Sequence, residues 1–357
     1  MRVLRIALLL MLGVAALPAA QCAETKTLPA IVRIGEVATG GLGKPTGGGL
    51  ASIAKEKGFF DEEFGKDGVQ LEVIYFPGAG TAVTESLASG NIDFGGSGGI
   101  CNIIGLAGQV PARVVSVSHG MIFPLYLAVR ADSPLHRVED LRNRKVVGQR
   151  GTNGQVLLDG ILAAHGLSES DVKEVNLQSA EALPALTAGL VDAVVGGAVL
   201  QQLSDQGRVR IIASSAEVAD PEGAIAGELV TNHFETTYPE ATARVVKVLT
   251  KAAWWASLPE NRQELIEFQA RTGIPSRYYE ADFSRDIAAR YSPLIDPAIR
   301  ESYRKLIAFG IDHKLIRKAS SFDGWFETKY LDQALHDLGL ESFWTAKEGA
   351  ATAPVGQ

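Results

Sequence analysis

Two stretches of this chain, residues 87–98 and 186–197, follow one pattern. The first reads Leu-Ala-Ser-Gly-Asn-Ile-Asp-Phe-Gly-Gly-Ser-Gly, and the second reads Leu-Thr-Ala-Gly-Leu-Val-Asp-Ala-Val-Val-Gly-Gly. Each predicts a helix end, a glycine in the left-handed conformation that closes helices, a short apolar strand, and glycines where the next helix begins. A unit of this kind used twice predicts two similar α/β halves. Loops from two such halves can face each other across a cleft, where small ligands bind.

The N-terminal segment has the composition of a secretory signal peptide. Arg2 and Arg5 precede an apolar run over residues 6–16, and small residues follow as far as residue 23. The run is shorter than the roughly 20 apolar residues that a transmembrane helix needs. Cleavage after Cys22 and cleavage after Ala23 both remain open, and lipidation of Cys22 is disfavoured because Gln21 precedes it. We expect residues 1–23 to be a signal peptide and the mature protein to be periplasmic.

Charge and cysteine content narrow the class of protein. The chain has a net charge of −7, which becomes −9 if Arg2 and Arg5 are removed with the signal peptide. An acidic chain without runs of Lys and Arg lacks the electrostatics of a nucleic-acid-binding protein. Cleavage would leave Cys101 as the thiol of the mature chain, and its apolar surroundings predict a small buried residue rather than a nucleophile.

Predicted strands and helices alternate over most of the chain, as in a mostly parallel sheet. Beyond about residue 231 the pattern turns almost wholly helical, and the small, polar residues 346–357 predict a disordered tail. The predicted strands cover residues 31–35, 69–75, 92–94, 112–117, 124–130, 145–147, 191–195 and 209–212.

Several phrases in this order resemble the exported substrate-binding proteins of ABC importers. They are Ala-Lys-Glu-Lys-Gly-Phe-Phe at residues 54–60, Phe-Pro-Gly-Ala at 76–79, the first repeated phrase, Leu-Ala-Val at 127–129, Ser-Pro-Leu at 133–135 and Val-Glu-Asp-Leu at 138–141. The resemblance covers residues 31–345. It is greatest to the receptors for aliphatic sulfonates, taurine and nitrate, whose fold also serves the receptors for thiamine pyrimidine precursors.

The resemblance implies an α/β periplasmic-binding-protein type II fold with two lobes, a ligand cleft between them and a helical C-terminal extension. Lobe one would comprise residues 31–121 and 229–345, lobe two would comprise residues 122–228, and strands near 121–129 and 213–229 would form the hinge. The expected partners are a small-molecule ligand and the membrane permease of an ABC importer. We expect a monomer that closes on its ligand.

Glycines and polar residues at the ends of predicted strands are the expected ligand contacts. Backbone N–H groups at helix N-termini, hydroxyls and a side-chain amide favour anionic oxygens such as those of a sulfonate, carboxylate or nitrate. The same residues can serve as packing glycines, helix caps, a solvated loop lysine or a structural histidine. The candidates are Thr39, Lys44, Gly78, Gly80, Thr81, Ser97, Gly98, Gly99 and His119 in lobe one, and Gly151, Thr152, Asn153, Gly196 and Gly197 in lobe two.

Two departures from the sulfonate-receptor pattern leave the ligand open. The turn at residues 194–199 carries neither the aromatic nor the acidic residue common there. Gly99 stands where those receptors often carry an acid that could hold an amino group, which makes taurine less favourable. A receptor for a neutral heterocycle, such as a thiamine pyrimidine precursor, is the alternative.

Other functions for the same fold are a periplasmic sensor and an enzyme. The six histidines are dispersed, without the H-x-x-x-H or H-E-x-x-H spacing of metal sites, and there is no cysteine cluster or G-x-S-x-G motif. We therefore expect no catalytic residues, no metal and no cofactor.

Overall fold

The computed structural model describes residues 28–38, 47–118, 124–177, 179–218, 225–280, 283 and 287–345. The predicted signal peptide, the predicted tail and the candidate contacts Thr39, Lys44 and His119 lie outside these residues. Among the residues described, no helix combines the length and the apolar character needed to cross a membrane.

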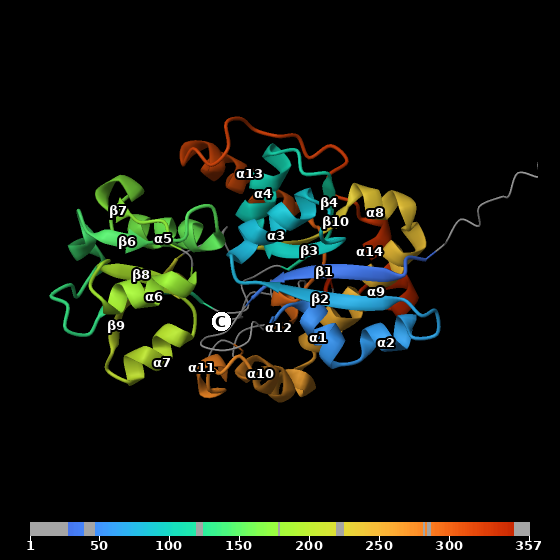
Figure 1. Cartoon of the computed structure of the whole chain (residues 1–357), viewed down its shortest axis with the longest axis horizontal. Coiled ribbons are helices and arrows are strands. Elements are labelled where there is room, and N and C mark those ends of the chain that lie inside the picture. The colour runs from blue at the N-terminus through green and yellow to red at the C-terminus, as the bar shows by residue number, and fades with distance from the viewer. Residues whose placement is uncertain are drawn as a thin grey trace, which may run out of the picture.

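The described strands form two five-stranded sheets, which Figure 1 shows side by side with their helices. The first sheet has the order β2-β1-β3-β10-β4, and the second has the order β7-β6-β8-β5-β9. The strands of the first sheet are β1 (Ile31–Val37), β2 (Gln70–Phe76), β3 (Phe94–Gly98), β4 (Ala112–Ser118) and β10 (Ala226–Thr231). Those of the second are β5 (Tyr126–Arg130), β6 (Lys145–Val147), β7 (Lys173–Glu174), β8 (Ala193–Gly196) and β9 (Val209–Ser214).

The two sheets share one topology, in which a single strand is inserted antiparallel to the others. β10 lies between β3 and β4 and is antiparallel to both, and β5 lies in the same way between β8 and β9. The remaining strands are parallel, as the alternation of strands and helices predicts. The first sheet with the helices packed on it is called the first half, and the second sheet with its helices is called the second half. The expected lobe boundary at residues 228/229 falls inside β10, which belongs to the first sheet over its whole length.

The glycines of the repeated phrase close two helices in the same way, as predicted. Gly90 follows α3 (Ala79–Ala88) with φ 70°, and Gly189 follows α6 (Ser179–Thr187) with φ 71°. The next N–H in each case bonds back to the last turn, from Asn91 to Ser86 O at 3.0 Å and from Leu190 to Ala185 O at 2.9 Å. This is the Schellman arrangement, which needs a residue tolerant of positive φ.

The aspartates of the phrase also have equivalent places. The Asp93 carboxylate accepts the backbone N–H of Arg33 at 2.8 Å, and the Asp192 carboxylate accepts that of Lys145 at 2.8 Å. Each aspartate thus fixes the strand after it, β3 or β8, against the start of the neighbouring parallel strand, β1 or β6. In the first copy the extended strand runs through the glycines to Gly98, further than predicted, because β1 and β10 pair with it on either side.

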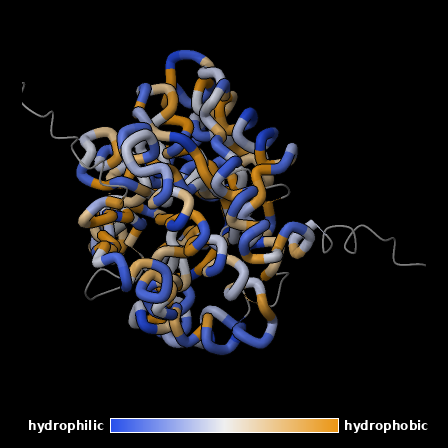
Figure 2. The backbone as a smooth tube through the Cα atoms, turned by 90° about the vertical axis from the view of Figure 1, so that its right-hand side faces the viewer, coloured by the Kyte–Doolittle hydropathy of each residue, from blue (hydrophilic) through white to orange (hydrophobic). Residues whose placement is uncertain are grey.

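Helices cover both sheets, and the chain after β10 is mainly helical, as predicted. Figure 2 shows hydrophobic and hydrophilic residues alternating along the tube, as expected where helices pack one apolar face against a core. The helices of the first half are α1 (Leu50–Glu56), α2 (Phe59–Phe64), α3, α4 (Gly99–Ala107), α8 (Asn232–Thr237), α9 (Pro239–Ser257), α10 (Arg262–Ala270), α11 (Arg277–Glu280), α12 (Ile287–Arg290), α13 (Pro297–Asp312) and α14 (Lys329–Leu338). Those of the second half are α5 (Asn153–Ala164), α6 and α7 (Val199–Asp205), with short 3-10 turns η1 (Val138–Leu141), η2 (Glu169–Asp171) and η3 (Ser215–Glu217).

The first sheet carries a hydrophobic core on each face. One contains Phe94, Val230 and residues of α1, α9 and α14, and the other contains Ile100, Tyr303 and residues of α3, α4 and α13. Pro239 occupies the first turn of α9, where its missing N–H costs no hydrogen bond. Of the strands held between these cores, β3 ends at Gly98, beside Asn153 of the second half.

Candidate functional site

The two halves meet where β3 ends and α5 begins. A Cβ atom built on Gly98 would lie 2.5 Å from Oδ1 of Asn153, so only glycine permits this approach without a shift. Asn153 Nδ2 donates to the carbonyl oxygen of Ile225 at 3.0 Å, and the Cys101 thiol lies 3.4 Å from the carbonyl oxygen of Gly151. We call the place where Gly98, Gly151 and Asn153 meet the junction.

Two helix N-termini converge on the junction. Gly98 precedes the first turn of α4 and provides no side-chain cap, while Thr152 caps α5 by accepting the N–H of Gly154 at 3.1 Å. The unpaired N–H groups and dipoles of helix N-termini favour negative charge. Asn153 Oδ1 is buried there and accepts no hydrogen bond. The junction therefore combines a positive backbone potential with a polar side chain that still has an acceptor to fill.

The predicted site residues divide into those at the junction and those away from it. Gly80 and Ser97 join the junction residues, since a Cβ on Gly80 would lie 2.7 Å from Cys101 Sγ and 3.1 Å from Ser97 Cβ. Gly99 faces the interior instead, where a Cβ would meet Leu306 at 2.6 Å. Close packing against α13 thus explains why residue 99 is a glycine.

The three predicted hydroxyls are all engaged within the chain. Thr81 donates to Gly78 O at 3.0 Å and Thr152 donates to Gln149 O at 2.7 Å, while Ser97 donates to the Oδ1 atom of Asn102. Their protons therefore stabilise turns and helix starts. The backbone N–H groups of Gly99, Gly151 and Gly154 are likewise engaged, with Ile225 O, Gln155 Oε1 and Thr152 Oγ1. The groups of the junction that could meet a ligand are therefore the next N–H groups of the two helices, at residues 100, 101 and 153, and the Asn153 amide.

The glycines at the end of β8 differ from each other. A Cβ on Gly196 would lie 3.0 Å from the Leu200 side chain, whereas a Cβ on Gly197 would meet nothing within 4 Å. Gly197 thus borders open space, and backbone conformation gives no further reason for a glycine there because its φ is not positive.

A row of mainly polar residues crosses the first sheet, and none of these residues was predicted as a site residue. Consecutive register partners from β2 to β4 form this row: Tyr75, Glu36, Gly96, Glu228 and Ser116. It lies on the face where Phe94 and Val230 belong to the core. Side chains alternate between the two faces of a strand, so Glu36 of β1 points to the same face as the buried Val32 and Ile34. A charged residue at such a core position was the sequence pattern that could have revealed the row.

Glu36 is buried and holds the start of α1. Its Oε1 accepts the backbone N–H groups of Ala51 at 2.8 Å and Ser52 at 3.1 Å, and its Oε2 accepts the Ser52 hydroxyl. Burial raises the pKa of the Glu36 carboxyl, and these hydrogen bonds partly oppose that rise. The N-terminus of α1 thus compensates a charge that the apolar surroundings disfavour.

Glu228 has a different environment in the centre of the row. A Cβ on Gly96 would lie 2.6 Å from its Oε1, so the glycine makes room for this carboxyl. Burial, and secondarily the charge of Glu36, raises the pKa of Glu228 to about 8. Its register partner Ser116 has a buried hydroxyl without a hydrogen-bond partner. At neutral pH Glu228 is therefore a protonated acid that can donate a hydrogen bond.

The arrangement of two sheets with matching strand order and a junction between them is that of the periplasmic-binding-protein type II fold. The periplasmic sulfonate-binding protein SsuA of Methylobacillus flagellatus KT, a provisional assignment, superposes with a TM-score of 0.72 at 29% identity, covering 88% of this chain and 96% of that one. The alkanesulfonate-binding protein SsuA of Xanthomonas axonopodis pv. citri, bound to MOPS, gives 0.68 at 22% identity, with 84% and 99% covered, and supports the fold alone. So does the desulfurization enzyme DSZB in complex with biphenyl-2-sulfinic acid, with a TM-score of 0.65 at 17% identity, covering 87% of this chain and 100% of that one.

Residues 50–261 match the family model described as NMT1/THI5 like, and the chain belongs to that family. A provisionally named aliphatic sulfonates-binding protein of Bacillus subtilis (strain 168) is 28% identical over 206 residues, which are 57% of this chain and 60% of that protein. Its counterpart in Escherichia coli (strain K12) is 32% identical over 124 residues, or 35% and 39%. The matched regions thus span less than two thirds of these relatives. The family resemblance inferred from the sequence is confirmed.

Proposed function

We propose that this protein is an exported receptor that captures an aliphatic sulfonate in the periplasm and delivers it to the permease of an ABC importer. The observation that carries the proposal is the junction, where the N-termini of α4 and α5 converge from opposite halves. A sulfonate offers three oxygens to several N–H donors at once and needs no cationic side chain. The relatives named for sulfonate binding support the same choice of headgroup.

The enzymatic alternative within this fold has a specific obstacle. Within the described residues the cysteine that could act as a nucleophile is Cys101. Burial raises the pKa of its thiol to about 12. A thiolate nucleophile at neutral pH requires a lowered pKa and some exposure. We therefore favour binding over catalysis at the junction.

A headgroup series tests the proposal with the alkyl chain held constant. Hexanesulfonate, hexanoate, hexylamine and hexanol would be compared by thermal shift and by calorimetry, with taurine, nitrate and a hydroxymethylpyrimidine as further arms. A ligand with micromolar Kd at millimolar concentration should stabilise the protein by about 4 kcal/mol. We expect the sulfonate to bind most tightly. Stabilisation by the pyrimidine or the neutral alcohol alone would refute the anion proposal.

Two variants locate the binding site. Asn153→Ala should weaken sulfonate binding more than tenfold, because it removes the second Nδ2–H of this amide, which can donate to a sulfonate oxygen. Asn91→Ala is the matched control, since Asn91 is exposed and precedes the opposite end of β3. Equal affinity in both variants would place the ligand elsewhere. Neighbouring genes for an ATPase and a permease would support transport, and a neighbouring sensor kinase gene would redirect the proposal to sensing.

A further inference from the structure

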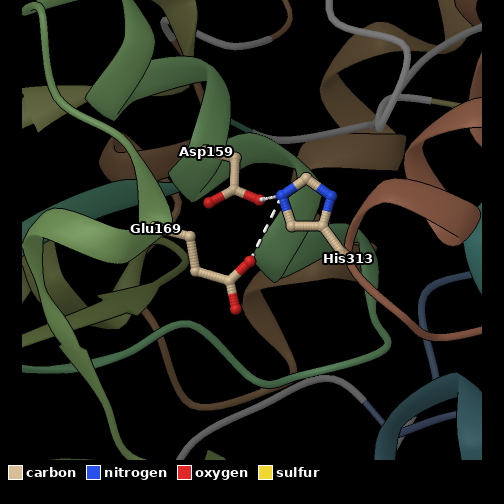
Figure 3. Close-up of side chains that lie close together, drawn as sticks. All are labelled: Asp159, Glu169 and His313. Carbon is tan, nitrogen blue, oxygen red and sulfur yellow. Dashed lines mark ion pairs between the residues drawn. The ribbon is translucent and has the colours of Figure 1, made fainter.

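Away from the junction, three side chains able to ligate a metal converge on one point (Figure 3). His313 Nε2 lies 2.8 Å from Asp159 Oδ2 and 3.3 Å from Glu169 Oε2. One ligand atom from each residue lies within 4.8 Å of the other two. Asp159 and Glu169 belong to α5 and η2 of the second half, whereas His313 follows α13 of the first half.

The histidine ring is oriented for ligation. Its Nδ1 lies 3.0 Å from the carbonyl oxygen of Phe309, and the ring stacks on the Phe309 ring with centroids 3.9 Å apart. A carbonyl at Nδ1 assigns the proton of the neutral ring to that nitrogen and leaves the lone pair on Nε2. Metal-binding histidines are commonly held in this way by a second partner. Here the lone pair points at two carboxylates, an arrangement that calls for a cation between them.

The charges around the cluster leave an excess of negative charge. Arg150 Nη1 lies 3.1 Å from Glu169 Oε1 and 3.3 Å from Glu174 Oε2, and its Nη2 donates to His313 O at 2.7 Å. One guanidinium thus pairs with two carboxylates, and the carboxylate of Asp159 lies on the other side of the cluster against His313. The carboxyl groups of the cluster thus outnumber the one guanidinium, and a divalent cation would offset the excess.

Two carboxylate oxygens of the cluster, Asp159 Oδ2 and Glu174 Oε1, are buried and accept no hydrogen bond, and the one polar atom close to Asp159 Oδ2 is His313 Nε2 at 2.8 Å. Burial of polar oxygens without compensation is costly, so such atoms call for a partner. Asp159 Oδ2 is one of the atoms aimed at His313 Nε2 (Figure 3).

We propose that Asp159, Glu169 and His313 form a zinc-binding site that ties the two halves of the protein together. Zinc bonds of about 2.0–2.1 Å to nitrogen and oxygen in tetrahedral geometry place neighbouring ligand atoms about 3.3 Å apart. The Glu169–His313 distance of 3.3 Å already has this value, and the Asp159–His313 distance of 2.8 Å needs to open by about 0.5 Å. A water molecule would complete the tetrahedron.

Zinc at this place would act on the contact between the halves. α13 packs on α4 in the first half, and its Leu306 and Ile307 belong to the core there. α5 begins at the junction, and Asp159 lies further along this helix. A metal bound to Asp159 would therefore hold α5 against the first half of the protein. The sequence predicts no metal site, because its histidines are not closely spaced. The three ligands proposed here come from separate segments of the chain.

The test uses the purified protein after chelation and dialysis, titrated with Zn²⁺ by calorimetry and with Co²⁺ by visible absorption. We expect one ion per chain with micromolar or tighter affinity, a Co²⁺ spectrum of low coordination number, and a higher Tm in zinc. His313→Gln and Asp159→Asn should each lower the affinity at least thirtyfold. His336→Gln should retain it, because that ring pairs with Glu341 at 3.0 Å on the exposed surface.

Glu169→Gln guards against the possibility that one variant unfolds, and circular dichroism verifies each fold. Equal zinc affinity in His313→Gln and His336→Gln would overturn the proposal, because the ion would then bind elsewhere. Absence of zinc binding by the unaltered protein would overturn it as well, and the contacts of His313 with Asp159 and Glu169 would then be structural only. Sulfonate binding is measured separately, so the failure of one proposal is distinguishable from that of the other.

Discussion

Replacing Glu228 by Gln should stabilise the protein increasingly as the pH rises. The folded carboxyl holds its proton up to about pH 8, while in the unfolded chain it ionises near its ordinary pKa of 4.5. Unfolding therefore releases a proton between these values, and the free energy of unfolding of the unaltered protein falls as the pH rises through this range. Glutamine keeps the shape and the hydrogen-bonding capacity of the protonated acid but has no proton to release.

The magnitude follows from the displacement of the pKa. A change from 4.5 to about 8 corresponds to at most about 5 kcal/mol, at roughly 1.4 kcal/mol for each pH unit. Glu228 is not wholly enclosed, so we expect about half of this, roughly 2–3 kcal/mol. Below about pH 4.5 both states carry the proton, and the difference between variant and unaltered protein should be smallest there.

Urea unfolding at several pH values between 5 and 8.5 measures the effect. The quantity of interest is the free energy of unfolding of Glu228→Gln minus that of the unaltered protein, in which titrations common to both cancel. The control is Glu72→Gln, which alters an exposed carboxyl of β2 in the same sheet. A difference for Glu228→Gln that stays constant across this range, as for the control, would refute the assignment of a protonated Glu228.

Three further predictions concern the junction and the repeated phrase. Gly98→Val should weaken sulfonate binding more than tenfold, or by about 1.4 kcal/mol, as measured by calorimetry. Gly197→Val should leave the fold intact in urea unfolding, because a Cβ there has open space. An unchanged affinity in Gly98→Val would contradict the close approach of the two halves. Asp93→Ala and Asp192→Ala should each cost about 1–2 kcal/mol in urea unfolding, because each removes an acceptor from a strand N–H, and a variant with an unchanged midpoint would show that its carboxylate has no such role. Cys101 should resist a thiol reagent such as DTNB in the native protein at pH 8 and react on unfolding, because burial raises the pKa of the thiol to about 12; rapid native labelling would show that the helix start is open.

Local patterns in the sequence predicted the parts of the fold that depend on local physics. Gly90 and Gly189 close helices because positive φ is needed there, and that requirement is visible in one short phrase. The similarity of the two phrases extends to β3 and β8, which occupy the same place in their sheets. A local pattern repeated in sequence thus predicted a repeated topology.

Features that depend on pairing between distant segments could not be predicted in this way. Glu36 and Glu228 join one row only because β10 inserts between β3 and β4, and no short sequence pattern specifies that insertion. The meeting of His313 with Asp159 requires α13 to end beside α5. Among the junction residues, Asn153 was predicted from its place after a strand, but its approach to Gly98 depends on how the halves pack.

The position of β10 has a consequence for the order in which the protein can fold during synthesis. Among the described strands β4 joins the first sheet only through β10, and β10 leaves the ribosome after every strand described in the second sheet. The second sheet can therefore close while the first still lacks its fourth strand and the helices α8–α14 that cover it. The half that contains the N-terminal strand is thus the last to be completed, and the nascent chain must keep β1–β3 and β4 apart until residues 226–231 arrive.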